Sequence, residues 1–352
     1  MTEWTPENLV FDSDNPKIPF KECGGSIILP KIHPLELEDP SHKELRYSQT
    51  ITNWIIQHFA TRIDGEGIIG AGKTEAGEEL RSLFPSLKVY REKVDEDVFI
   101  TFYMDMMLHG GALQQFLAND RKRLNITTGE LSSPSYKDRH ESMDYVFGKL
   151  LGLKPEQLDR LEKTIIANPY RPHMMMHFDC SVETALSRIV ERAKKDPKRI
   201  FELSDLEGRL LNQEEIASVG RGMHKLLYAS NRYCPPDEHE AYLKEVQKKG
   251  IPVMFKPQGV SPEYLRALSD EYQKLPDLCS KFNLNTVLAT IDVNNIDFKD
   301  ARYRLALTYA VKYGRCVDLM RKGFQIEESK KEGYFRVTSP YGTTKEFRPD
   351  YQ

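Results

Sequence analysis

The sequence is poor in cysteine, in net charge and in long apolar runs. Its 352 residues include five cysteines without Cys-x-x-Cys spacing, which argues against a disulfide framework or a zinc site and favours reduced thiols in the cytoplasm. Lys and Arg number 50 against 53 Asp and Glu, so no overall positive charge favours nucleic acid. No uncharged apolar run is long enough to span a membrane. The acidic N-terminal segment lacks the apolar core of a secretory signal and the arginines of a transit peptide.

Short apolar runs alternate with helical patterns through the middle of the chain, which predicts a parallel sheet with crossover helices. The apolar runs 173–178 and 286–291 should be buried strands of that sheet. By contrast, segments 59–66 and 129–137 contain too many polar residues to be good candidates for central strands.

The length suggests two domains, or one large α/β domain with insertions. We expect an irregular N-terminal arm that ends in a short helix (1–60), a main domain (61–298) and a C-terminal helix and hairpin (299–352). A Lys- and Pro-rich stretch at about 193–260 should be an insertion in the main domain. Helices are expected in the arm and the insertion at residues 46–60, 212–228 and 237–249.

One segment fits the phosphate-binding pattern Gly-x-x-x-x-Gly-Lys-Ser/Thr at every defined position: Gly67, Ile68, Ile69, Gly70, Ala71, Gly72, Lys73 and Thr74. Glycines let backbone N–H groups curl around phosphate oxygens, and the following helix points its positive end at them. Lys73 would reach the outer phosphates and the Thr74 hydroxyl would ligate Mg²⁺. The pattern predicts phosphate binding, which by itself does not choose among P-loop enzymes.

A second group of residues bears on the class of reaction. Glu92 follows a short apolar segment, and a carboxylate there could act as general base toward a substrate hydroxyl. A single Glu in a charged loop is more often simply solvated. Arg139 and Asp144 should lie at the opening of a helix.

Seven segments resemble the deoxynucleoside kinase family, in the family's order and over much of residues 64–298. They are EGIIGAGKT, EKV (92–94), FYMDMMLHGGALQQFLANDR, DRHESMDYVF, FDCSVETALSRIVER, YLRALSDEY and TIDVNNIDF. The first three resemble the family's phosphate loop, its Glu-Pro-Val motif and its Phe-Tyr-x-Asp helix. The resemblance implies an α/β P-loop kinase, with a parallel β-sheet flanked by helices, a lid insertion and N- and C-terminal extensions.

The resemblance also implies roles around the phosphates. Glu92 would be the general base that takes the proton from the sugar 5′-hydroxyl as it attacks the γ-phosphorus of ATP. Arg139 would support that carboxylate and the developing charge. Lys73, Arg188 and Arg192 would clamp the phosphates, because phosphoryl transfer depends mostly on positioning and charge neutralisation.

Further roles concern the nucleoside. By the same resemblance, Tyr103 would contact the sugar 3′-hydroxyl and Gln114 would read the edge of the base. Arg121 and Asp144 would lie near the far edge of the base, where Asp144 could accept from an exocyclic amine. In this family that pairing accompanies deoxyadenosine, deoxyguanosine or deoxycytidine more than thymidine.

The sequence also departs from the family pattern. Ile68 replaces the Asn of the loop, Lys93 replaces the Pro after the general base, and His140 replaces a Ser. The lid departs most: Lys194 stands where an Arg is usual, and the lid Glu that binds the 3′-hydroxyl has no clear counterpart.

The leading interpretation is ATP- and Mg²⁺-dependent 5′-phosphorylation of a purine or cytosine deoxynucleoside by a cytoplasmic enzyme. A nucleoside monophosphate kinase would need additional cations in the acceptor site, which the insertion could supply. A non-catalytic subunit is the third interpretation, because the fold also occurs as an accessory subunit of mitochondrial respiratory complex I. The retained Lys73, Glu92 and Arg139 favour an enzyme. Family members often dimerise through helices beside the sheet, so a homodimer is expected.

Overall fold

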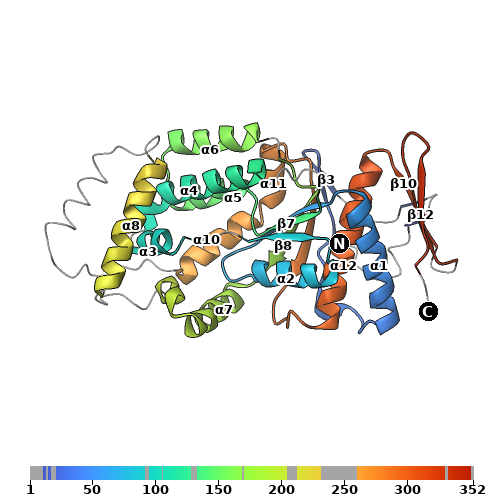
Figure 1. The fold of residues 1–352 in the computed structure, drawn as a ribbon, viewed down its shortest axis with the longest axis horizontal. Coiled ribbons are helices and arrows are strands. Elements are labelled where there is room, and N and C mark those ends of the chain that lie inside the picture. Colours follow the sequence, from blue (N-terminus) through green and yellow to red (C-terminus); the bar gives the residue numbers. More distant parts are fainter. Residues whose placement is uncertain are drawn as a thin grey trace.

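The computed structural model describes residues 11–12, 15–16, 21–91, 95–104, 106–127, 133–168, 170–203, 212–230, 260–329 and 332–349. The molecule is elongated, with helix α8 (Gln213–Ser230) at one end and the C-terminal strands at the other (Figure 1). No helix in these stretches is long and apolar enough to cross a membrane.

A seven-stranded sheet forms the centre of the molecule. In spatial order its strands are β3 (Lys21–Cys23), β4 (Ser26–Ile28), β9 (Val287–Asp292), β8 (Met174–Asp179), β5 (Arg62–Glu66), β7 (Ser135–Lys137) and β6 (Lys88–Tyr90). All neighbouring strands are parallel except β3, which pairs antiparallel with β4. Strands β7 and β8 lie on opposite sides of β5, so the strand order reverses at β5. At such a point a crevice opens beyond the carboxyl end of the strand.

Helices cover both faces of the sheet, as the alternation of side chains along β8 shows. Met174 packs against Gly314, where an added Cβ would lie 2.8 Å from the methionine Cε. The next residue, Met175, has its sulfur 3.8 Å from that of Cys279. The first face carries α12 (Ala301–Arg321), with α1 (His42–His58) packed on it, and the second carries α11 (Leu275–Lys281).

The other helices surround the carboxyl edge of the sheet and one end of it. They are α2 (Lys73–Leu83), α3 (Glu96–Met104), α4 (Met106–Thr127), α5 (Ser142–Leu150), α6 (Pro155–Ala167), α7 (Val182–Lys195), η4 (Pro197–Glu202) and α10 (Pro262–Tyr272). Short elements near the N-terminus are β1 (Phe11–Asp12), β2 (Asn15–Pro16) and η2 (Pro34–Glu36).

Several predicted elements are confirmed. They are the helix at 46–60 (α1), the strands at 173–178 (β8) and 286–291 (β9), the helix near 212–228 (α8), and the C-terminal helix and hairpin. The helix expected at 237–249 lies outside the described residues.

The expected irregular arm is wrong for residues 21–28, because β3 and β4 belong to the sheet. β4 adds to the edge of β9, where the Ile27 N–H donates to the Thr286 carbonyl at 3.0 Å. Leu29, just past the strand, donates to the Leu288 carbonyl at 2.9 Å. An apolar run of three residues is enough for a strand when an existing edge supplies the hydrogen bonds.

The expectation that segments 59–66 and 129–137 are too polar for central strands is also wrong. Strands β5 and β7 lie within these segments and pair side by side. Their polar residues compensate each other: Lys137 Nζ lies 3.5 Å from Asp64 Oδ2 and 3.2 Å from Glu141 Oε1. The Tyr170 hydroxyl donates to the other oxygen of Asp64 at 2.9 Å. Burial still raises the pKa of Asp64 to about 7.

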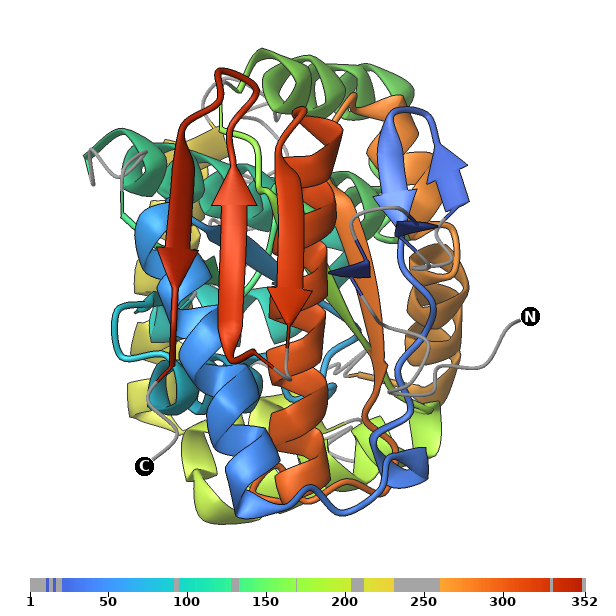
Figure 2. The same cartoon turned by 90° about the vertical axis from the view of Figure 1, so that its right-hand side faces the viewer.

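A separate three-stranded sheet packs on α1, in front of it in Figure 2. Its strands are β10 (Gln325–Ser329), β11 (Tyr334–Thr338) and β12 (Thr344–Phe347), each antiparallel to the next. Trp54 of α1 stacks on Phe347 at 5.6 Å and meets Phe335 edge-on at 5.9 Å. The polar strand β10 was not predicted. It is attached to α12 by a buried ion pair between Lys312 and Glu328 at 2.8 Å.

Replacing Lys137 with Met should destabilise the chain by about 3–5 kcal/mol, because it leaves two carboxylates buried without their cation. The matched control is Lys163→Met, which removes an exposed ion pair with Asp159 on α6 and should change stability little. Urea unfolding measures both. An equal loss of stability in the two variants would contradict the conclusion that Lys137 compensates the buried carboxylates beside β5 and β7.

Candidate active site

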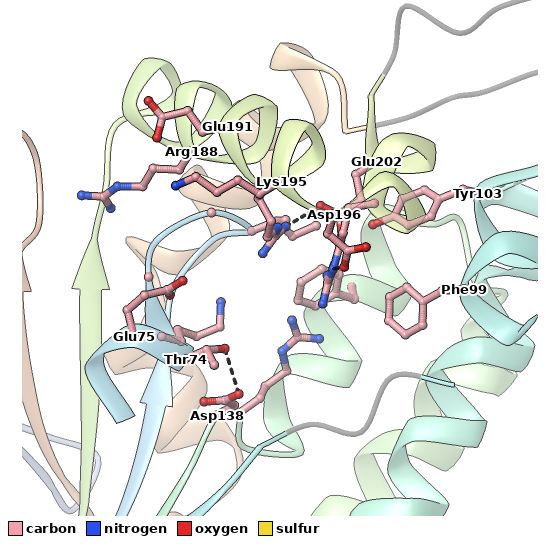
Figure 3. A pocket seen from close by; sticks show the side chains of 18 of the residues that line it. Thr74, Glu75, Phe99, Tyr103, Asp138, Arg188, Glu191, Lys195, Asp196 and Glu202 are labelled. Atoms are coloured by element: carbon pink, nitrogen blue, oxygen red, sulfur yellow. Dashed lines mark hydrogen bonds and ion pairs between the residues drawn. The ribbon is translucent and has the colours of Figure 1, made fainter. Parts of the chain in front are cut away.

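A cavity of about 670 Å³ opens at the carboxyl edge of the sheet. The phosphate loop and the turn after β7 form one side, and α3 and α4 form the opposite side. Helix α7 and η4 cover it, and the loop at 296–298 closes one end. In Figure 3, Thr74 and Asp138 lie across the cavity from Phe99 and Tyr103.

The phosphate loop has the geometry that its glycines predict. Gly70 and Gly72 have φ of 85° and 86°, a backbone conformation that residues with side chains rarely adopt. A Cβ at Gly70 would lie 2.6 Å from the Ala185 carbonyl oxygen, so this position is also too tight for one. Lys73 Nζ donates to the carbonyls of Gly67 and Ile68 at 2.8 and 3.0 Å. The ammonium group thus lies over the loop, at the start of α2.

Thr74 contacts a carboxylate that we did not predict. Its hydroxyl donates to Asp138 Oδ2 at 3.1 Å (Figure 3). An alcohol and a carboxylate oxygen beside a phosphate loop suit Mg²⁺, which uses one or two protein oxygens together with substrate phosphates. The signal was available in the sequence, because Asp138 directly precedes Arg139 in a motif already recognised.

Arg139 lines the cavity, and its guanidinium lies 4.4 Å from the ring centroid of Phe147. The planar group is thus held against an aromatic face in the site. Lys73 lines the same cavity. Glu92, the predicted general base, lies outside the described residues.

Two of the predicted nucleoside-binding residues line the cavity and two do not. Tyr103 and Gln114 are buried lining residues, and no described residue hydrogen-bonds to the buried Oε1 of Gln114. Arg121 and Asp144 instead form a buried ion pair with each other, and neither is among the residues that line the cavity.

Glu202 is a second residue that sequence reasoning missed. It lines the cavity with Tyr103 and binds Arg192 and Arg199, the latter at 2.7 Å. Burial raises the pKa of Tyr103 well above its usual value, and the charge of Glu202 raises it further. A carboxylate therefore lies near Tyr103, where the sequence showed no counterpart of the lid Glu. Nothing local identified it, because the turn of η4 brings it back toward α7.

Arg188 lies midway along α7, beside the loop after β9. Its Nη2 donates to the Val293 carbonyl at 2.7 Å, and its guanidinium lies 4.7 Å from the Phe298 ring centroid. Both Arg188 and Phe298 line the cavity, so a flat cation and an aromatic ring face its interior together.

Glu66, the last residue of β5, is fully buried under the loop. Its Oε1 accepts from the His140 N–H at 2.6 Å and its Oε2 from the Tyr272 hydroxyl at 3.3 Å. Burial raises the pKa of Glu66 to about 8, against the opposing influence of the His140 N–H and the charge of Arg139.

The strand order and the phosphate loop at the end of the central strand define a P-loop kinase fold. Residues 63–208 match the model of the deoxynucleoside kinase family. Through this part of its sequence, the chain is similar to that family of phosphotransferases.

Individual relatives were also found. The chain is 27% identical over 183 residues to a deoxyadenosine kinase of Dictyostelium discoideum, which covers 50% of this chain and 70% of that protein. A structure of deoxyadenosine kinase from M. mycoides with bound dATP covers 53% of this chain and 100% of its own, at 15% identity and a TM-score of 0.34. The same enzyme with the products dCMP and a flexible dCDP covers 53% and 98%, at 14% identity and a TM-score of 0.34.

Replacing Glu66 with Gln should make the chain progressively more stable than the wild type as pH rises from 5 to 8. Folding raises this pKa from 4.5 to about 8, so the folded chain keeps a proton that the unfolded chain releases in this range. The wild type should lose up to roughly 1.4 kcal/mol per pH unit relative to the variant. The nearby Asp64, Lys73 and Arg139 are common to both proteins. Urea unfolding at several pH values tests this, and a pH-independent difference would contradict it.

Proposed function

We propose that the chain transfers the γ-phosphate of ATP to the 5′-hydroxyl of a deoxynucleoside, with a purine or cytosine base favoured over thymine. The observation that carries this is one cavity with two unlike walls. Lys73 and the Thr74–Asp138 pair lie on one wall, and Tyr103 and Gln114 on the other. Such a cavity suits a polyphosphate donor facing a flat acceptor. Both relatives described above are called deoxyadenosine kinase, so deoxyadenosine is the first acceptor to test.

On the donor side, the loop N–H groups and Lys73 hold the phosphates, and the positive end of α2 points at them. Thr74 and Asp138 would hold Mg²⁺, which when bound neutralises phosphate charge. Arg188 and Phe298 offer a stacking surface to the adenine of ATP.

On the acceptor side, Glu92 removes the proton of the 5′-hydroxyl, as the family resemblance implies, and Arg139 stabilises the charge that develops. Tyr103 and Glu202 bind the 3′-hydroxyl, with Glu202 in the role of the lid carboxylate. Gln114 Oε1, buried without a described partner, is an acceptor for an amino group on the base.

An enzyme is favoured over a non-catalytic subunit because Lys73 and Arg139 line one open cavity that the described part of the insertion does not fill. A monophosphate acceptor is the second candidate, since Lys195 and Arg199 add cations to the same cavity. For the compartment and the assembly, we propose the cytoplasm and a homodimer.

The first test is product formation from ATP-Mg²⁺ with the four deoxynucleosides and their monophosphates. We expect conversion of deoxyadenosine or another purine or cytosine nucleoside. Lys73→Ala and Glu92→Gln should each lower kcat by about 100-fold or more, because each removes charge stabilisation or proton transfer. Turnover of monophosphates alone would show that the acceptor is a deoxynucleoside monophosphate. A folded chain that converts none of them would favour the non-catalytic interpretation.

A matched pair of variants tests the metal site. Thr74→Ser keeps the hydroxyl, whereas Thr74→Ala removes it and leaves Asp138 without this donor. We expect Thr74→Ala to raise the Mg²⁺ concentration for half-maximal activity by about 10-fold or more, with Thr74→Ser close to the wild type. The measurement is a Mg²⁺ titration at fixed ATP. Equal titration curves for the two variants would exclude Thr74 as a ligand.

A further inference from the structure

Helix α8 belongs to the insertion and begins beyond residue 208, where the family match ends. It packs along α3 and also touches α4, at the end of the molecule farthest from the C-terminal strands (Figure 1). Within the described chain, no α8 residue lines the cavity. Among the described elements, α8 contacts chiefly α3 and α4, so these two helices connect it to the site.

The contact between α8 and α3 is centred on Asp97. Three α8 side chains bind this one carboxylate: Ser218 Oγ at 2.6 Å, Arg221 at 3.0 and 3.1 Å, and Lys225 Nζ at 2.9 Å. Lys225 also binds both oxygens of Asp95, at 2.8 and 2.9 Å. These bonds hold the pKa of Asp97 well below its usual value, against the effect of burial. The first turn of α3 is thus fixed by cations from the insertion.

The two backbones also approach very closely. A Cβ added at Gly222 would lie 2.0 Å from the Asp97 carbonyl oxygen and 2.1 Å from Thr101 Oγ1. The Thr101 hydroxyl donates to the Val219 carbonyl at 3.1 Å, inside the interface. Only glycine permits this separation, so the position of α3 is set by backbone contact as well as by charge.

The opposite side of α3 forms the acceptor wall. Phe99, Phe102 and Tyr103 all line the cavity. Asp95 and the start of α3 also follow directly on the segment that carries Glu92. A shift of α3 would therefore move the aromatic wall against which the nucleoside lies, while the phosphate loop on the other side would stay in place.

We propose that α8 is a positioning element for the acceptor site: its contact with α3 sets the affinity for the nucleoside and leaves ATP binding unaffected. This inference rests on the proposed function, because it assigns the acceptor to the α3 side of the cavity. It gives the insertion a role as an external brace of the substrate wall. The residues of α8 act through α3 and do not touch substrate.

Two glycines on α8 provide a matched test. Gly222→Ala forces α8 away from α3, whereas Gly220→Ala makes the same change two residues away, where nothing lies within 4 Å. Both variants gain the same helix propensity, so their difference isolates the contact. We expect Gly222→Ala to raise KM for the deoxynucleoside by roughly 10-fold or more, since a shift on the order of 1 Å at a site is costly. KM for ATP should not change, and Gly220→Ala should match the wild type in both.

The outcomes separate this inference from the proposed function. If the wild type phosphorylates the nucleoside but Gly222→Ala and Gly220→Ala have equal nucleoside KM, only the positioning role of α8 is overturned. An equal rise in the KM for the nucleoside and the KM for ATP in Gly222→Ala would overturn that role as well. No phosphorylation by the wild type would overturn the proposed function, and the brace with it. If Gly222→Ala does not fold, Arg221→Ala replaces it. The nucleoside KM should then rise in Arg221→Ala and recover in Arg221→Lys, which keeps a cation near Asp97; a nucleoside KM unchanged in both would overturn the brace.

Discussion

The hydrogen bond from the His140 N–H to Glu66 holds together the two segments on which the site is built. Glu66 ends the strand that leads into the phosphate loop, and His140 follows the turn that carries Asp138 and Arg139. At 2.6 Å inside the protein, this bond fixes one backbone against the other with little freedom. The phosphate loop and the turn with Asp138 and Arg139 are therefore held against each other.

Tyr136 strengthens the same junction from the strand behind it. Its hydroxyl donates to the Lys73 carbonyl at 2.9 Å, and its ring end lies so close to Gly65 that a Cβ there would meet the hydroxyl at 2.0 Å. The start of α2, the central strand and its neighbour β7 thus share one contact. The polar character of β5 and β7, which made them poor candidates from sequence, is part of this construction.

The sequence predicted what local pattern encodes, and missed what depends on partners distant in the chain. The phosphate loop, β8 and β9 are visible in short windows, because glycine spacing and apolar runs need no knowledge of neighbours. Asp64 is acceptable in a buried strand because Lys137 lies on the next strand and Tyr170 donates to its other oxygen. Glu202 joins the cavity only because η4 turns back toward α7. Such residues carry no local signature, and Glu92 lies outside the described residues, so its predicted role stays a prediction.

The pairing of β4 with β9 has a consequence for how the chain assembles. Ile27 lies opposite Val287, and their numbers differ by 260. A contact this remote in sequence closes a very long loop, which slows its formation. During synthesis, β4 emerges long before its partner strand β9. A ribosome-bound chain can pair β4 with β3, but the edge of β4 that joins the sheet stays without its partner until β9 appears.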